Sequence, residues 1–283
     1  MAAFISPVLL TVIVGLIAAV MLAVASKVMA VPVDETAVKI RACLPGANCG
    51  ACGYAGCDDY AAALAADHSI RTNLCVPGAD GVASMVAAAL GQEALDVIEM
   101  VANVKCSGIC DATKPEMDYQ GMKSCAAVKG FFGGPGTCKY GCIGFGDCVS
   151  TCAYDAISVC EGVARVDRDL CRGCGACAKA CPQKIIALIP DIKRVHVECS
   201  SLDKGKVVTQ ACKAGCIGCK KCEKTCKFDA IHVENNLAVI DYDKCKNCGM
   251  CAKECPRRII QVFKKANVKP IVKVDDAEAA QKA

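Results

Sequence analysis

The sequence has no tryptophan, and its six tyrosines and six phenylalanines amount to only 4% of its 283 residues. An interior built on aromatic packing is therefore excluded, although aromatic side chains dominate the energetics of many cores. Apolar residues still make up 54% of the chain, and 27 of them are cysteines. We expect an interior of small aliphatic side chains and metal clusters, because the free energy of metal binding can replace that of a hydrophobic core.

Several motifs are also missing. No basic residue precedes the first apolar stretch, so the sequence shows no cleavable signal peptide. Disulfide frameworks are typical of small secreted domains, so the cysteines indicate thiolates in a reducing, cytosolic compartment. No phosphate loop ends in Gly-Lys-Ser/Thr, which argues against a nucleotide site. The three histidines stand at no metal-ligand spacing, and we predict no catalytic residue on this chain.

Two cysteine runs carry the main chemical signal. They are Cys171-x2-Cys174-x2-Cys177-x3-Cys181-Pro182 and Cys245-x2-Cys248-x2-Cys251-x3-Cys255-Pro256. Both match the run of bacterial two-cluster ferredoxins, in which three cysteines bind one [4Fe–4S] cluster and the fourth binds the other. Zinc ribbons also use Cys-x2-Cys pairs, but three cysteines at two-residue gaps before x3-Cys-Pro fit zinc poorly.

An uncharged stretch lies close to the start of the chain. Phe4 to Ser26 is rich in Val, Leu, Ile and Ala, and about 20 such residues suffice to span a bilayer as a helix. We therefore expect a transmembrane anchor within residues 1–30, with a buried helix of a soluble protein as the alternative. Lys27, Lys39 and Arg41 follow on one side, so the positive-inside rule predicts a single-pass protein of the inner (cytoplasmic) membrane with its bulk in the cytoplasm.

Residues 31–100 predict a small, mostly helical domain with one cluster. Pro32 and Pro45 disfavour helix, so residues 31–45 are interpreted as a tether. Cys49-x2-Cys52-x4-Cys57 follows, and an Ala-rich interval, residues 58–74, separates it from Cys75. That interval and the amphipathic stretch 82–100 both predict surface helices.

The rest of the chain repeats itself at an offset of 74 residues. Cys142-Ile143-Gly144 returns as Cys216-Ile217-Gly218, and each copy holds two short β-branched segments joined by a turn. These segments predict β-hairpins, 157–159 with 163–166 and 231–233 with 237–240. We therefore predict an α+β chain with tandem bacterial-type, βαβ-like, two-cluster ferredoxin modules over residues 101–190 and 191–270, and a disordered tail over 271–283.

The spacing rule distributes twenty cysteines over five [4Fe–4S] clusters. In the first module Phe145 stands where the second has Cys219, and Cys138 can fill that vacancy. The expected sets are Cys49, Cys52, Cys57 and Cys75 (cluster 1); Cys138, Cys142, Cys148 and Cys181 (cluster 2); Cys152, Cys171, Cys174 and Cys177 (cluster 3); Cys216, Cys219, Cys222 and Cys255 (cluster 4); and Cys226, Cys245, Cys248 and Cys251 (cluster 5).

A sixth cluster is a further hypothesis, for a total of five to six. Val104-Lys-Cys106-Ser and Val197-Glu-Cys199-Ser match locally, and each is followed by one more spaced cysteine, Cys125 and Cys212. Cys125 and Cys199 also stand at the repeat offset. These four cysteines could close cluster 6, whereas buried free thiols that pack as small hydrophobic side chains are the alternative. Cys43, Cys110 and Cys160 are interpreted as non-ligands.

Together, the leading apolar stretch, Cys49-x2-Cys52-Gly53-x2-Gly56-Cys57 with Cys75, and two ferredoxin modules resemble the RnfB family of the Rnf ion-translocating electron-transport complex. The resemblance covers nearly the whole chain, in the longer form with two modules. It implies an iron–sulfur subunit of a ferredoxin:NAD+ oxidoreductase that takes electrons from reduced ferredoxin and passes them to integral membrane subunits that export Na+ or H+. The alternatives are an activator of corrinoid proteins and, in another class, a zinc-binding or cluster-storage scaffold.

Basic residues concentrate near the C-terminus. Residues 212–269 hold 13 lysines and arginines against 6 acidic residues, with no aromatic stacking platform that would favour nucleic acid. A cationic surface raises encounter rates with acidic partners, although a solvated face that only maintains solubility is the alternative. We expect ferredoxin to dock on the basic side chains beside the two cysteine runs, Lys220, Lys221, Lys224, Lys227, Lys253, Arg257 and Arg258.

Overall fold

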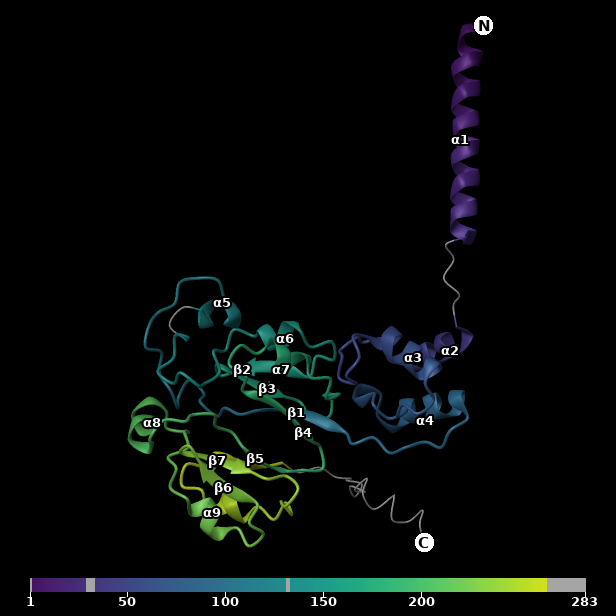
Figure 1. Cartoon of the computed structure of the whole chain (residues 1–283). Helices are drawn as coiled ribbons and strands as arrows, with labels where there is room; N and C mark the ends of the chain where they lie inside the picture. Colours follow the sequence, from purple (N-terminus) through teal and green to yellow (C-terminus); the bar gives the residue numbers. More distant parts are fainter. Residues whose placement is uncertain (1, 29–33, 131–132, 264–283) are drawn as a thin grey trace, which may run out of the picture.

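The computed structural model describes residues 2–28, 34–130 and 133–263. After α1 the chain forms three bodies, which we call the N-terminal module (34–98), the first ferredoxin module (100–190) and the second ferredoxin module (195–263) (Figure 1). The N-terminal module lies beside the first ferredoxin module, and the second packs against the first on another side. The tail predicted to be disordered, residues 271–283, lies outside the described residues.

The helices are short apart from α1. They are α1 (Ala2–Val28), α2 (Glu35–Cys43), α3 (Cys57–Ala66), the 3₁₀ turn η1 (Val76–Gly78), α4 (Ala79–Leu90), α5 (Cys125–Lys129), α6 (Asp147–Ser150), α7 (Ala176–Ala180), α8 (Gly205–Ala211), α9 (Lys221–Thr225) and α10 (Met250–Glu254). The strands are β1 (Met100–Val104), β2 (Ile157–Cys160), β3 (Val163–Val166), β4 (Ile186–Pro190), β5 (Val195–Val197), β6 (Ile231–Glu234), β7 (Leu237–Ile240) and β8 (Ile260–Val262).

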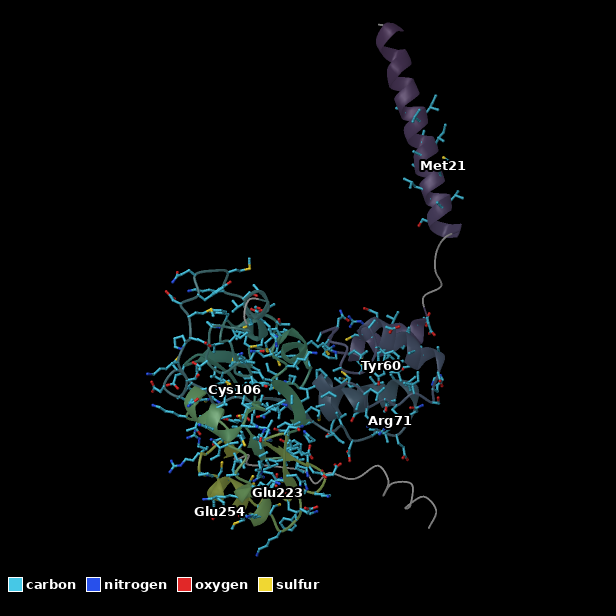
Figure 2. All side chains as sticks on the ribbon, turned by 60° about the vertical axis from the view of Figure 1, so that its left-hand side comes forward. Met21, Tyr60, Arg71, Cys106, Glu223 and Glu254 are labelled. Carbon is cyan, nitrogen blue, oxygen red and sulfur yellow. The ribbon has the colours of Figure 1, made fainter. Side chains whose placement is uncertain are left out.

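The predicted transmembrane helix over Phe4–Ser26 is wrong. Among the described residues, no helix is both long enough and apolar enough to cross a membrane. The side chains of residues 12–26 in α1 are exposed, as Met21 shows in Figure 2. The same finding contradicts the expected single-pass membrane insertion.

The N-terminal module packs three helices around a small core. Ile40, Tyr60, Leu64 and Val86 are fully buried in it. Helix α2 occupies most of the expected tether, because its prolines flank the helix and the Asp34 side chain caps it by accepting from Thr36 N–H. The two predicted surface helices are shorter than expected. α3 stops at Ala66, and α4 stops before Gly91, whose φ of +67° ends the helix in a left-handed cap.

Each ferredoxin module holds two antiparallel strand pairs. The predicted hairpins are confirmed as β2–β3 and β6–β7. The pairs β1–β4 and β5–β8 join the first strand of each module to its last, and the sequence pattern did not predict them. They seal a core of Val, Ile and Ala side chains in which cysteines are embedded.

The repeat extends to backbone conformation. Gly173 and Asn247, 74 positions apart, have φ values of +62° and +60°, and Asp155 and Asp229 have φ values of +51° and +50°. The first strands of the two modules do not follow the offset of 74. Val104 pairs with Ile186 in the first module, and Val197, 93 positions after Val104, pairs with Ile260 in the second. The first module therefore carries an insertion between β1 and Cys142, and α5 lies within it.

Candidate iron–sulfur centres

Two cysteine-lined cavities lie in the second ferredoxin module. One is lined by Cys216, Cys219, Cys222 and Cys255, with Ile217, Val233 and Ile259 among its apolar walls. The other is lined by Cys226, Cys245, Cys248 and Cys251. The structure thus brings together the four cysteines expected for cluster 4 and the four expected for cluster 5.

The first module departs from its expected set at one position. Its cavity is lined by Cys142, Cys148, Cys181 and Cys125, and Cys138 is not among its lining residues. The pKa of the Cys148 thiol is raised to about 12, mainly by burial and also by the neighbouring Cys142, Cys125 and Cys181. The structure therefore places Cys125 beside Cys142, Cys148 and Cys181, at the place where the sequence led us to expect Cys138.

Cys138 lies instead in a cavity between the two modules. This cavity is lined by Cys106 and Cys138 from the first module and by Cys199 and Cys212 from the second, and Cys142 also reaches it. The pKa of the Cys138 thiol is raised to about 11, mainly by burial and also by Cys106, Cys212 and Cys199. We call Cys106, Cys138, Cys199 and Cys212 set 6; Cys125, which the sequence led us to expect there, is not among the lining residues. Figure 2 shows Cys106 in the middle of the two-module body.

A carboxylate positions Cys125 from the inserted segment. The Asp147 carboxylate accepts hydrogen bonds from Cys125 N–H and Ala126 N–H, both at 2.9 Å, and from the Ser124 hydroxyl at 2.9 Å. Burial opposes ionisation of Asp147, but these bonds outweigh it and lower the pKa of the carboxyl. α5 therefore begins at the wall of the cavity, where its first residue fills the position that Phe145 leaves without a thiol.

The remaining two sets also gather in space. Burial raises the pKa of Cys177 to about 11, and Cys171, Cys174 and Cys152 surround it. Burial also raises the pKa of Cys75, next to Cys57, Cys49 and Cys52. These are the expected sets for clusters 3 and 1. Each of the other three cysteines has a polar partner of its own: Cys43 with Lys39 O, Cys110 with Glu161 O and Cys160 with Ser158 Oγ.

The sets follow one another through direct contacts. Cys142 N–H donates to Cys106 Sγ at 3.4 Å, which joins sets 2 and 6. Cys216 N–H donates to Cys199 Sγ at 3.3 Å, which joins sets 6 and 4. Lys179 Nζ donates to Cys49 O at 2.8 Å, which joins sets 3 and 1. Within each ferredoxin module, both cysteine runs contribute to both sets, so the two sets of a module lie next to each other. The spatial order of the sets is therefore 5, 4, 6, 2, 3, 1.

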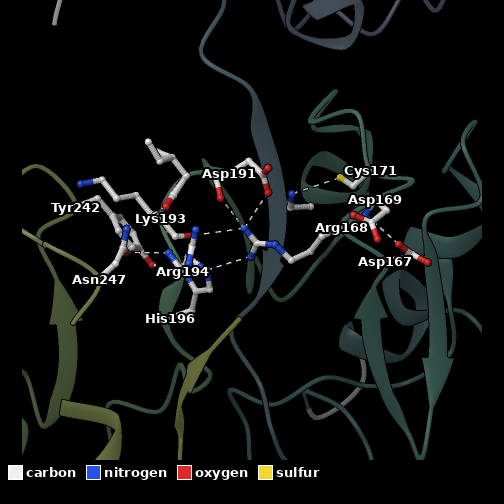
Figure 3. Close-up of polar contacts among 12 residues, drawn as sticks. Asp167, Arg168, Asp169, Cys171, Asp191, Lys193, Arg194, His196, Tyr242 and Asn247 are labelled. Carbon is white, nitrogen blue, oxygen red and sulfur yellow. Dashed lines mark hydrogen bonds and ion pairs between the residues drawn. The ribbon is translucent and has the colours of Figure 1, made fainter. Parts of the chain in front are cut away.

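A buried polar network also joins the two modules (Figure 3). The Arg168 guanidinium contacts His196 Nε2 at 3.0 Å and Asp191 Oδ1 at 3.0 Å, and it lies over the Phe263 ring. His196 Nδ1 contacts Tyr242 OH at 3.1 Å. The sequence did not predict this network, since none of its members stands in a recognisable motif.

The basic residues expected to dock ferredoxin divide into two kinds. Lys220, Lys221, Lys224, Lys227, Lys253 and Arg258 are exposed. Arg257 is half-buried and donates to Cys212 O at 2.8 Å and to Gly215 O at 3.4 Å. Its guanidinium therefore holds the loop that carries a ligand of set 6 and is not available for docking.

The donor sets consist of thiols alone, the ligand type that iron–sulfur clusters use. Across residues 34–130 and 133–263, no three His, Cys, Asp or Glu side chains converge as they would around one metal ion. Four thiolates on a cubane each bind a different iron, so they stand farther apart than the ligands of one ion. Cysteines around apolar cavities fit that requirement.

Comparisons with known proteins agree with this chemistry. Residues 44–77 match the family described as "Putative Fe-S cluster", residues 164–187 match "4Fe-4S binding domain", and residues 215–259 match "4Fe-4S dicluster domain". The chain is 42% identical to the RnfB-type subunit of the Na(+)-translocating ferredoxin:NAD(+) oxidoreductase complex of Acetobacterium woodii, over 87% of this chain and 74% of that protein.

Two further relatives cover more of their own length. The corresponding subunit of the proton-translocating ferredoxin:NAD(+) oxidoreductase complex of Clostridium ljungdahlii is 40% identical, over 89% of each chain. That of the ion-translocating oxidoreductase complex of Methanosarcina acetivorans is 38% identical, over 88% of this chain and 94% of that protein. The chain belongs to the RnfB family. As a member of the RnfB family, it is an iron–sulfur electron-transfer subunit of a ferredoxin:NAD+ oxidoreductase complex, with domains that bind [4Fe–4S] clusters.

Proposed function

We propose that this subunit receives electrons from reduced ferredoxin and relays them through six [4Fe–4S] clusters to membrane subunits of its complex. The single observation that carries the proposal is the unbroken order of the six cysteine sets, from set 5 in the second module to set 1 in the N-terminal module. When bound, each cluster accepts and donates single electrons. We place the subunit at the membrane that holds the complex, through contacts with those other subunits.

The residues of the chain have three tasks in this relay. Twenty-four cysteines hold the clusters in six sets of four, and the cysteines that line each cavity or surround each buried thiol support this grouping. Apolar side chains such as Ile217 and Ile259 line the cavities and exclude water. Backbone contacts such as Cys142 N–H to Cys106 Sγ keep neighbouring sets close, so that electrons can pass between them.

The ligand sets are tested by single replacements. Cys138→Ser and Cys125→Ser should each lower the iron content by about four atoms per chain, because each removes one ligand of a different cubane. Cys110→Ser is the matched control, since this exposed thiol donates to Glu161 O and belongs to none of the six sets. The EPR signals lost in the two variants should differ. Loss of the same signals in both would show that the two cysteines belong to one set.

The relay is tested by following reduction in the Cys138→Ser protein. Set 6 alone joins the two ferredoxin modules in the observed order, so its loss should isolate the second module. Reduced ferredoxin should then reduce the clusters of the second module at the parent rate, while those of the first and N-terminal modules stay oxidised far longer. Freeze-quench EPR measures both. Parent-rate reduction throughout the chain would show that electrons bypass set 6.

A further inference from the structure

The N-terminal module covers one face of the first ferredoxin module. Lys179, on α7, donates from Nζ to Cys49 O at 2.8 Å. A Cβ at Gly50, next to Cys49, would lie 3.3 Å from the same Nζ. Lys179 shares α7 with Cys177 of set 3, so this face is where set 3 meets the one-cluster N-terminal module.

The repeat places the same face on the second ferredoxin module. At the offset of 74, Tyr154 corresponds to Phe228, Cys174 to Cys248, and Lys179 to Lys253. The side-chain packing also repeats, because a Cβ at Gly175 would lie 3.2 Å from Leu188 and a Cβ at Gly249 would lie 3.3 Å from Val262. The two faces are thus built alike around set 3 and set 5.

Their exposure differs. Tyr154, Cys174 and Leu188 are half-buried in the first module. On the second module, Phe228 is 44% exposed, Met250 40% and Val262 45%, and Cys248 is exposed. We call the side chains of Phe228, Lys246, Cys248, Met250, Lys253 and Val262 the set 5 face.

The set 5 face has the composition of a docking surface for an acidic partner. Phe228 and Met250 form an apolar centre beside Cys248, and they and Lys246 line the set 5 cavity. Lys253 and Arg258 line the adjoining depression with Cys248 and Val262. An apolar centre with a charged rim is the usual anatomy of an interface, and cationic rims steer acidic partners into place.

We propose that a reduced iron–sulfur carrier with an acidic surface docks on the set 5 face. The docked carrier lies against set 5 in the same way that the N-terminal module lies against set 3. The inference rests on the proposed function and adds the entry point, since set 5 is the end of the relay opposite set 1. The face beside set 4, with Lys220 and Lys221, is the competing surface, and Lys220 there already pairs with Glu223 at 3.9 Å.

The test compares two matched charge reversals in the full complex. Lys246→Glu with Lys253→Glu alters the set 5 face, and Lys220→Glu with Lys221→Glu makes the same charge change beside set 4. Stopped-flow spectroscopy follows reduction by an acidic ferredoxin at about 0.01 M salt, where the Debye length is about 30 Å. We expect the first pair to slow reduction at least tenfold, with a weaker effect at high salt, and the second to leave the rate near that of the parent. A small neutral reductant should reduce all three proteins equally.

A second measurement uses the unmodified protein and does not depend on activity. Zero-length carbodiimide coupling of the complex with ferredoxin should join Lys253 or Lys246 to ferredoxin carboxylates, as located by mass spectrometry. Coupling of these lysines to another subunit or to a second copy of this chain would overturn the inference. So would equal rates for the set 5 pair and the parent, or slowing by the set 4 pair alone. Failure of ferredoxin to reduce even the parent protein would instead overturn the proposed function.

Discussion

At the scale of single residues, His196 has the least usual environment in the described chain for a basic group. Its side chain is fully buried between Arg168 of the first module and Tyr242 of the second. The pKa of its imidazole is lowered to about 4, mainly by burial and also by the Arg168 charge. The ring is therefore neutral at physiological pH, and one of its nitrogens can accept from Arg168.

This environment predicts a pH-dependent stability. An unfolded histidine has a pKa near 6.5, so between pH 6.5 and about 4 the unfolded chain binds a proton that the folded chain does not. The contribution of His196 is fully present above pH 6.5 and falls as the pH drops, with a limiting slope of about 1.4 kcal/mol per pH unit. His196→Gln should flatten the dependence of the thermal midpoint on pH between 7.5 and 5.5. His232→Gln is the control, and an unchanged slope in His196→Gln would contradict the assignment.

Residue spacing predicts most, but not all, of the groups in which the cysteines lie. The cysteines of each run lie together in space as the spacing predicts, because consecutive cysteines lie on one short loop and helix. The structure places Cys125 and Cys138 in each other's expected cavities, because the offset of 74 pairs Cys125 with Cys199, whereas the strand register pairs Cys106 with Cys199. An insertion had shifted the sequence register, and only the fold reveals which thiol reaches which cavity.

At the scale of elements, α5 shows how a short helix can be fixed by its first turn. Five residues cannot form a stable helix alone, so the bonds from Asp147 to the first turn and the Ser124 cap hold it. Asp147→Asn should remove about 1 kcal/mol of capping and loosen Cys125. We expect faster loss of about four irons per chain to a chelator, with the other clusters retained. Asp243→Asn, on an exposed loop, is the control, and equal iron release from both variants would argue against this role.

Elements were predictable where their pattern was local. The hairpins β2–β3 and β6–β7 follow from β-branched segments on either side of a turn. The pairs β1–β4 and β5–β8 join segments far apart in sequence, which no local pattern specifies. The sequence pattern did not predict α2, because Pro32 and Pro45 disfavour helix at their own positions, whereas α2 lies between them. For α1, apolar composition predicted a helix but did not establish a membrane span.

At the scale of the whole molecule, the two ferredoxin modules meet around one shared site. Cys106 and Cys138 of the first module correspond to Cys199 and Cys212 of the second, so set 6 draws equal parts from both repeats. Gln183 and Arg257, 74 positions apart, hold the two loops that carry Cys138 and Cys212 through bonds to Lys139 O and Cys212 O. The repeat is therefore the reason that the relay can cross from one module to the other.

The other crossing, from the first module to the N-terminal module, depends on fewer contacts. Lys179 supplies a charged hydrogen bond to Cys49 O, and such bonds contribute roughly 1.5–3 kcal/mol. Lys179→Met should weaken the seating of the N-terminal module on α7 and slow reduction of set 1 by about tenfold, while set 3 is reduced at the parent rate. Lys184→Met is the matched control, since this exposed lysine has the same charge and lies one turn beyond α7. Freeze-quench EPR of the set 1 signal measures the rate, and a parent-like rate in Lys179→Met would show that the rest of this interface suffices to seat the module.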